Sequence, residues 1–497
     1  MMNITIGAKS VTEQKARAYG FFVPEGSDLK EHLKEAIILY PALLDIVKAR
    51  DFTGKNGQIV SLPFVQDGNM HDLIIVGVGV STRTSYAPGL EEYRRAVGYL
   101  VRHASSLRAT TLAIQLTTDA FIEQIAIIAP MSTYQFDDFL SDKKQKDATL
   151  QDIILCGDID KDHISKLLEK GAIIAQAVNK ARHWVDSPPT QLTPMVLAEK
   201  AQEIAQQHNL GITVFDEKEI IEMGMGGLAA VSRGSEVDCC LIILEYKTQK
   251  KDAPTVAFVG KGITFDSGGL SLKPARHMET MKEDMSGAAA VIASMEAIAL
   301  LKPDINVIGI APSSENLPSG KATKPGDIVR FYNGKTAEIK NTDAEGRLIL
   351  ADALSYAVKN YTLDAIMDFA TLTGACAHAL GPYYSGMMSE YDELIAQVQE
   401  SAKRSGDYVW RLPLGDDYKQ AIKSNVADIC NIGNEKIMAG ATTAAHFLQN
   451  FVENVPWVHF DIAGTAFDVP NVPYYGSGAT GAGVRLMIDL ARHWNNK

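Results

Sequence analysis

The stretch "NTDAEGRL" (341–348) carries charged side chains at every second position, namely Asp343, Glu345 and Arg347. This alternation is typical of a strand with one solvated face, because successive side chains of a strand point to opposite sides. The alternative is that all three side chains face one ligand. That alternative requires partners from other parts of the chain.

Candidate partners follow an apolar run, where "KGITFDSGGLSLKP" supplies Lys261, Asp266 and Lys273. A further carboxylate, Asp284, precedes an alanine-rich tract. Clustered carboxylates cannot all stay ionised in a cleft without a cation, and one or two divalent metal ions are an ordinary solution. An oxygen-rich ligand set with a nitrogen donor suits Mg²⁺, Mn²⁺ or Zn²⁺. A lysine can join such a set only when neutral, which a neighbouring metal favours.

Taken singly, each residue has an ordinary structural role. Asp284 resembles a helix cap, "DSGG" resembles a turn, and isolated lysines usually lie at the surface. A carboxylate cluster also serves phosphoryl transfer, so a two-metal phosphatase or nuclease remains an alternative on these residues alone. The P-loop pattern GxxxxGK[ST] and the zinc motif HExxH do not occur in the sequence.

The elements that must position these residues follow from the apolar pattern of the second part of the chain. Strand candidates are 211–215, 240–246, 255–260, 305–311, 365–372 and 457–463. Helical stretches separate most of them, which predicts a large central sheet with helices on both faces. The apolar tract 286–301 is interrupted by Glu296 and predicts a buried helix. Ligands of such sheets bind beyond the carboxyl ends of the strands, where the candidate residues lie.

The first part of the chain predicts a smaller α/β domain, with strands at 72–80 and 109–116 around a helix at 90–106. The charged stretch 141–147 is typical of a linker, and a helical pattern runs from about 163 to 185 before consecutive prolines end it. The expected fold class is therefore α/β, with a smaller N-terminal domain and a larger C-terminal domain built on a mixed sheet. We place the boundaries at 1–160 for the N-terminal domain, 161–190 for the linking helix and 191–497 for the C-terminal domain.

Composition limits the class of protein. The chain has 497 residues, 46% hydrophobic, and a formal net charge of -12. This acidic balance makes nucleic acid an unlikely main partner, because nucleic-acid binders usually present a basic surface. The five cysteines form no CxxC pair and fit a reducing compartment. The expectation is a cytoplasmic protein without a membrane partner.

The motifs together resemble the leucine aminopeptidase (cytosol aminopeptidase) family. "NTDAEGRL" matches the signature of that family in full, and "VGKGITFDSGGLSLKP", "MKEDMSGAAAV", "DFATLTGA" and "HFDIAGTA" follow the family's pattern in the same order. The resemblance covers roughly residue 165 to the end, while the first 160 residues are similar only in length and α/β pattern. It implies a metal-dependent aminopeptidase that releases N-terminal amino acids, preferably Leu and other apolar residues, by means of a water shared by two metal ions.

The same resemblance implies a role for each candidate residue. It assigns two divalent ions per subunit, Zn or Mn with Mg or Co possible, to Lys261, Asp266, Asp284, Asp343 and Glu345. One ion takes Lys261, Asp266, Asp284 and Glu345, and the other takes Asp266, Asp343 and Glu345. Lys273 helps to polarise the scissile carbonyl, and Arg347 holds a bicarbonate ion that acts as general base. The pocket for the first side chain of a peptide substrate is formed by Met281, Thr371, Leu372 and Gly374. A homohexamer is implied as well, and a nucleic-acid-binding role of the N-terminal domain stays an alternative that the acidic charge disfavours.

Overall fold

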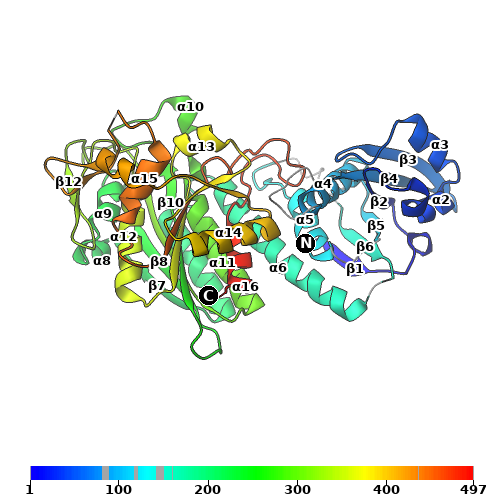
Figure 1. The fold of residues 1–497 in the computed structure, drawn as a ribbon, viewed down its shortest axis with the longest axis horizontal. Coiled ribbons are helices and arrows are strands. Elements are labelled where there is room, and N and C mark those ends of the chain that lie inside the picture. The colour runs from blue at the N-terminus through cyan, green and yellow to red at the C-terminus, as the bar shows by residue number, and fades with distance from the viewer. Residues whose placement is uncertain are drawn as a thin grey trace. The chain divides into compact units, whose positions relative to one another are not determined.

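The computed structural model describes residues 2–80, 89–116, 121–141, 150–158, 160–434 and 436–495. The chain divides into two compact units (Figure 1). The smaller unit comprises Met1–Asn179 together with Pro470–Gly476, and the larger unit comprises Lys180–Val469 together with Ser477–Lys497. Helix α6 (Lys161–Asp186) begins in the first and ends in the second. The linker predicted at 141–147 lies, apart from Ser141, outside the described residues.

The smaller unit is built on a six-stranded sheet in the order β1-β6-β5-β2-β4-β3. Its strands are β1 (Asn3–Ile6), β2 (Ala18–Pro24), β3 (Ile59–Gln66), β4 (Asn69–Gly79), β5 (Thr111–Gln115) and β6 (Asp152–Cys156). Only β3 runs antiparallel to its neighbour, so the predicted smaller α/β domain is confirmed and its sheet is mixed. The helix predicted at 90–106 is α4 (Leu90–Ser106).

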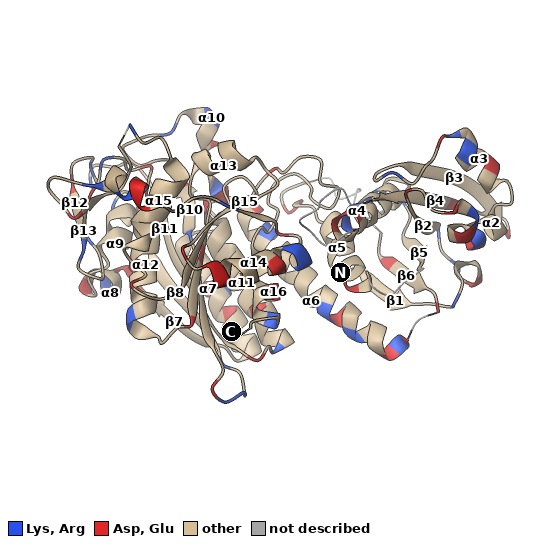
Figure 2. Cartoon of the chain, viewed as in Figure 1, with Lys and Arg blue, Asp and Glu red and all other residues tan. Residues whose placement is uncertain are grey.

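The remaining helices of the smaller unit surround this sheet. They are α1 (Leu29–His32), α2 (Lys34–Leu39), α3 (Leu43–Ala49) and α5 (Ile122–Ser132), with a 3₁₀ turn η1 at Val11–Glu13. Figure 2 shows basic and acidic residues together on α2 and α3 and along α6. The charge on these helices is therefore mixed.

A segment from near the end of the chain completes the smaller unit. Tyr474 donates a hydrogen bond from its hydroxyl to the buried carboxylate of Glu91, at 3.0 Å, and Arg95 donates to the carbonyl of Asn471, at 3.0 Å. A side chain at Gly98 of α4 would place its Cβ 2.9 Å from the carbonyl carbon of Pro473, so only glycine fits there. The predicted boundaries instead place this segment within the C-terminal domain, 191–497.

The larger unit contains a nine-stranded mixed sheet in the order β16-β15-β18-β14-β9-β11-β8-β7, with β10 paired to β11. The strands are β7 (Gly211–Phe215), β8 (Cys240–Tyr246), β9 (Thr255–Gly260), β10 (Gly262–Asp266), β11 (Asn306–Asn316), β14 (Ala365–Ala370), β15 (Ser385–Met388), β16 (Val409–Arg411) and β18 (Trp457–Asp461). Strands β18, β14, β9 and β11 are parallel and form the centre. All six predicted strands are present, and the predicted central mixed sheet is confirmed.

Helices cover both faces of this sheet, as predicted. Ile308 and Ile310 of β11 belong to the apolar cluster that also contains Ile349 and Ala353 of α12 (Gly346–Asn360). Between them, a Cβ on Gly309 would point the other way, 2.7 Å from the side chain of Met295 in α11 (Ser286–Leu301). The two helices therefore lie on opposite faces of the sheet.

The other helices of the larger unit flank these two. They are α7 (Pro194–His208), α8 (Glu217–Glu222), α9 (Gly226–Ser232), α10 (Ala275–Met278), α13 (Gly374–Leu380), α14 (Asp392–Ser405), α15 (Gly440–Gln449) and α16 (Val484–Arg492), with 3₁₀ turns η3 (Met281–Met285) and η4 (Asp416–Ile422). A small sheet of β12 (Ile328–Arg330), β13 (Thr336–Glu338) and β17 (Ile429–Cys430) lies beside them.

Helix α11 matches the predicted buried helix at 286–301. Among the described residues, the stretch Ala275–Leu301 is long and apolar enough to cross a membrane, but 83% of its most apolar window is buried in the protein. The helix also approaches the sheet closely, since a Cβ on Gly287 would lie 2.0 Å from the carbonyl oxygen of Phe369 in β14. This contact fixes the start of α11, and Asp284 just before it, against the sheet.

Candidate metal centre

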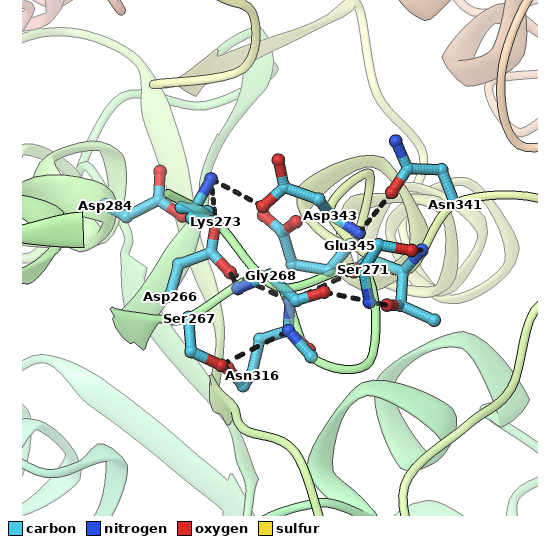
Figure 3. Close-up of polar contacts among 12 residues, drawn as sticks. Asp266, Ser267, Gly268, Ser271, Lys273, Asp284, Asn316, Asn341, Asp343 and Glu345 are labelled. Atoms are coloured by element: carbon cyan, nitrogen blue, oxygen red, sulfur yellow. Dashed lines mark hydrogen bonds and ion pairs between the residues drawn. The ribbon is translucent and has the colours of Figure 1, made fainter. Parts of the chain in front are cut away.

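The candidate residues gather where the central strands end. Lys261 directly follows β9, Asp266 ends β10, Asp284 lies in the 3₁₀ turn η3, and Glu345 directly precedes α12. Figure 3 shows the carboxyl groups of Asp266, Asp343 and Glu345 around the ammonium group of Lys273. One carboxylate oxygen from each of these three acids lies within 4.8 Å of the others. The fold therefore brings these candidate residues together, two at strand ends and two at helix starts.

Lys261 is almost fully buried, 2% exposed, and its ammonium group has three acceptors. It contacts Asp284 Oδ1 at 2.7 Å and Glu345 Oε1 at 2.8 Å, and donates to the carbonyl of Thr371 at 3.0 Å. The hydroxyl of Thr371 donates in turn to Asp284 Oδ1, at 2.7 Å. Two acids and one lysine thus share a buried, closely packed part of the site.

Lys273 forms the second half of the cluster. Its Nζ lies 2.9 Å from Asp266 Oδ2 and 2.6 Å from Asp343 Oδ1. The other oxygen of Asp266 accepts hydrogen bonds from the amide of Gly268 and from the side chain of Asn316, both at 2.8 Å. Lys273 and Asp343 are partly exposed, so this half of the cluster faces solvent.

Among the described residues, three buried carboxylate oxygens of the cluster make no hydrogen bond. One of them, Asp343 Oδ1, lies 2.6 Å from Lys273 Nζ, and the other two are Asp284 Oδ2 and Glu345 Oε2. A buried acceptor without a partner is costly, because its desolvation is not compensated. These last two oxygens belong to residues that also contact Lys261. This donor set of carboxylate oxygens and an amine fits a divalent metal ion.

Ionisation of several acids in the cluster is electrostatically unfavourable. Burial, with the neighbouring charge of Glu345, raises the pKa of Asp266 to about 6. Burial likewise raises the pKa of Asp284 well above its usual range. Burial also opposes ionisation of Glu345, but Lys261 and Lys273 outweigh it and lower the pKa of that carboxyl. Four acids share two lysines here, so added positive charge would stabilise the ionised cluster.

The stretch "NTDAEGRL" is not a strand. Asp343 lies in a turn, Glu345 directly precedes α12, and Arg347 lies in the first turn of that helix. The side chain of Thr342 ties the turn to the preceding loop. Its Oγ1 accepts a hydrogen bond from the amide of Ser271 at 2.8 Å and donates one to the carbonyl of Gly268 at 2.7 Å. The alternation of charges therefore reflects a turn followed by a helix start.

Arg347 is buried beside the acids without being one of the ligand candidates. Its Nη1 donates to the carbonyl of Asn431 at 2.7 Å, whereas its Nε has no hydrogen-bond partner in the described parts of the chain. Burial lowers the pKa of Arg347 to about 10, against the opposing effect of Glu345 and Asp461. An unpartnered, buried guanidinium nitrogen suits an anion.

Gly346 has a role that its sequence position did not indicate. The sequence suggests that its small size lets the backbone pass close to an anion at Arg347. In the structure, a Cβ at Gly346 would lie 2.4 Å from Cε and 2.7 Å from Nζ of Lys261. The glycine therefore makes room for the lysine of the cluster.

The four residues predicted for a side-chain pocket come from the turn after β14, from η3 and from the start of α13. Thr371 contacts both Lys261 and Asp284, and Leu372 follows it in the same turn after β14. Met281 begins η3, and Gly374 begins α13 with an exposed surface. The structure thus brings Thr371 into the cluster, and the pocket itself stays a prediction.

Sequence reasoning missed several residues that hold the site in shape. Asn316 at the end of β11 donates to Asp266 and also to the carbonyl of Thr342, at 3.0 Å. Asp461 at the end of β18 accepts from the amides of Leu372 and Thr373. Both residues end a central strand of the structure, but the predicted strand 305–311 stops short of Asn316 and the predicted strand 457–463 runs past Asp461.

Comparisons with known proteins agree with this geometry. The profile of the Cytosol aminopeptidase family, catalytic domain, matches residues 179–488, and that of the Cytosol aminopeptidase family, N-terminal domain, matches residues 20–143. The second match corrects the expectation that the resemblance begins near residue 165. It extends the likeness to the smaller unit.

Relatives and solved structures cover nearly the whole chain. A probable cytosol aminopeptidase of Chlorobaculum tepidum is 43% identical over 90% of this chain and 91% of its own, and one of Alkaliphilus oremlandii is 37% identical over 99% of each. Tomato leucine aminopeptidase, in a mutant form, has a TM-score of 0.87 at 32% identity and covers 99% of this chain and 96% of its own. The bottromycin maturation enzyme BotP in complex with Mn has a TM-score of 0.83 at 32% identity, covering 96% and 99%. With these matches over both units and an acidic cluster that fits a metal, the chain belongs to the cytosol aminopeptidase family and is a metal-dependent aminopeptidase.

Proposed function

We propose that the cluster binds two divalent metal ions through Lys261, Asp266, Asp284, Asp343 and Glu345. The observation that carries this proposal is that the buried oxygens Asp284 Oδ2 and Glu345 Oε2 have no hydrogen-bond partner among the described residues, while carboxylate oxygens of Asp266, Asp343 and Glu345 lie within 4.8 Å of one another. Bound divalent ions supply a water of lowered pKa as nucleophile at neutral pH. Zn²⁺ and Mn²⁺ are the leading ions, Mg²⁺ and Co²⁺ are further possibilities, and BotP is a relative solved with Mn.

In this proposal Lys273 acts on the substrate. Its ammonium group is the more exposed of the two lysines, so it can reach the carbonyl oxygen of a bound peptide. Negative charge grows on that oxygen during attack, and a fixed donor stabilises it more in the transition state than in the ground state. Lys273 is therefore the proposed electrophilic catalyst.

The residues around Thr371 select the substrate. The free α-amino group of a peptide can join the site in neutral form, whereas an internal peptide bond offers no such amine. We assign the pocket for the first side chain to Met281, Thr371, Leu372 and Gly374. An adaptable methionine fits a preference for Leu and other apolar side chains.

A panel of aminoacyl anilides tests this function. We expect Leu to be released fastest, N-acetyl-Leu not at all, and removal of metal by a chelator to lower the rate by about 100-fold or more. Adding Mn²⁺, Zn²⁺ or Co²⁺ should restore the rate. Hydrolysis that survives complete metal removal, or turnover of phosphoesters without peptides, would contradict the proposal.

We propose further that Arg347 holds a bicarbonate ion, which would supply a general base to the site. The support is its buried Nε without a partner. Arg347→Ala should keep both metal ions but lower kcat by about 10²-fold, since general-base catalysis contributes about that much. Bicarbonate added to depleted buffer should accelerate the parent enzyme and leave the variant unchanged. The exposed Arg330→Ala is a control, and loss of metal from Arg347→Ala would reject this role.

The remaining assignments concern assembly and location. We propose a homohexamer in the cytoplasm, with residues 1–160 as a domain for assembly or regulation, 161–190 as a linking helix and 191–497 as the catalytic part. The five buried free cysteines are compatible with a reducing compartment. Sedimentation of the purified protein tests the assembly directly.

A further inference from the structure

One peptide group links the candidate metal ligand Lys261 to a buried acid outside the metal set. The carbonyl oxygen of Thr371 accepts from Lys261 Nζ at 3.0 Å, and the amide of Leu372 donates to Asp461 Oδ1 at 3.2 Å. These two atoms belong to the same peptide unit. Since that unit is planar and trans, its carbonyl and its N–H point in opposite directions. Lys261 and Asp461 therefore hold the two ends of one rigid group.

Asp461 is itself firmly fixed. It is fully buried at the end of β18, and its Oδ2 accepts from the hydroxyl of Thr373 at 2.5 Å. Its Oδ1 also accepts from the amides of Thr373, at 3.3 Å, and Ala463, at 3.2 Å. The carboxylate thus ties the turn after β14 to the neighbouring strand.

This link acts on Lys261 in two ways. It orients the carbonyl of Thr371, and a hydrogen bond from the amide to a charged carboxylate polarises the peptide, which strengthens that carbonyl as an acceptor. A neutral lysine amine that ligates a metal keeps N–H bonds to donate, and the carbonyl of Thr371 is one of its acceptors here. Mutation of a group that is hydrogen-bonded to a metal ligand commonly lowers metal affinity by about 10- to 100-fold.

We propose that Asp461 is a positioning residue that sets the metal affinity of the Lys261 side of the site through the Thr371–Leu372 peptide. The proposal rests on the proposed two-ion function, in which Lys261 and Asp284 bind the same metal ion. The hydroxyl of Thr371, which donates to Asp284, reinforces the effect because the same turn holds it. Asp461 touches neither ion nor substrate in this role.

The test is calorimetric titration of metal-stripped protein with Mn²⁺. Asp461→Asn keeps the shape of the side chain but removes its charge and replaces one acceptor with a donor. We expect one of two binding steps to weaken by about 10-fold or more and the other to change by less than about threefold. The rate with saturating Mn²⁺ should recover in part, since excess metal refills a weakened site.

Two further variants separate positioning from loss of stability. Asp352→Asn is the matched control, because Asp352 is also fully buried and accepts from two backbone amides, those of Leu228 and Tyr332. It should lower the unfolding temperature of the metal-free protein but leave both binding steps unchanged. Thr373→Val removes the hydroxyl that donates to Asp461 and should weaken the same step as Asp461→Asn, whereas Thr373→Ser should not.

The outcomes are decisive in either direction. Unchanged metal binding in Asp461→Asn, or equal weakening of both steps, would overturn the proposal. If Asp461→Asn does not fold, Thr373→Val against Thr373→Ser decides in its place. Absence of peptidase activity in the parent protein would reject the proposed function, whereas the metal titrations would still report on Asp461.

Discussion

Glu345→Ala should lose metal and lower turnover by about 10³-fold or more, the largest effect expected for any single change. Glu345 is 2% exposed, contacts Lys261 at 2.8 Å, and belongs to the three-acid cluster within 4.8 Å. A catalytic metal supplies several kcal/mol of stabilisation to the transition state, which corresponds to a rate factor of this order. Asp343→Ala should behave similarly, with loss of the second ion only. Metal content by mass spectrometry and steady-state hydrolysis of a leucyl anilide measure both effects.

A matched control exists on α11, where the buried Glu296 lies 3.4 Å from His208 and also pairs with Lys180. Glu296→Gln should retain metal and turnover, because this acid lies outside the candidate cluster. Normal hydrolysis by Asp343→Ala or Glu345→Ala would reject the metal assignment.

Lys273→Met should be the second largest effect, with kcat reduced by about 10²- to 10³-fold while the metal content stays near that of the parent. The reason is loss of a donor for the developing oxyanion, which typically costs about this factor. KM should change little, since the interaction strengthens mainly in the transition state. Steady-state kinetics with metal analysis on the same sample give the answer.

The structure also offers a competing role for Lys273, which this variant distinguishes. Its ammonium group neutralises Asp266 at 2.9 Å and Asp343 at 2.6 Å. If that were its main role, Lys273→Met would change metal affinity at least as much as kcat. Lys340→Met, at a half-exposed lysine next to Glu338, serves as the neutral control.

The central strands and the buried helix of the larger unit could be predicted because their apolar runs are continuous and bounded by glycine or polar residues. β9 and α11 lie where the sequence placed them. Short strands such as β15, β16 and β17 were missed, because two to four residues carry no readable period. Their pairing depends on neighbours that are remote in the chain.

In the candidate site, too, some features could be predicted from the sequence and others could not. The identity of Asp343 and Glu345 as acids near a strand end was readable, but their backbone conformation was not. Thr342 and Ser271, 71 residues apart, shape that turn by hydrogen bonds in both directions. No local pattern encodes such contacts, and an alternating charge pattern alone therefore predicted a strand.

The return of Pro470–Gly476 to the smaller unit has a consequence for biosynthesis. The hydroxyl of Tyr474 and the carboxylate of Glu91 are 383 residues apart in the chain. Nearly the whole polypeptide must therefore be synthesised before residues 470–476 can pack against α4 in the smaller unit. This unit is an exception to the general order, in which domains fold as they are synthesised. Until then, the hydrogen bond from Tyr474 to Glu91 and the close packing of Gly98 against Pro473 cannot form. The nascent chain thus keeps its earliest unit incomplete while the catalytic sheet assembles.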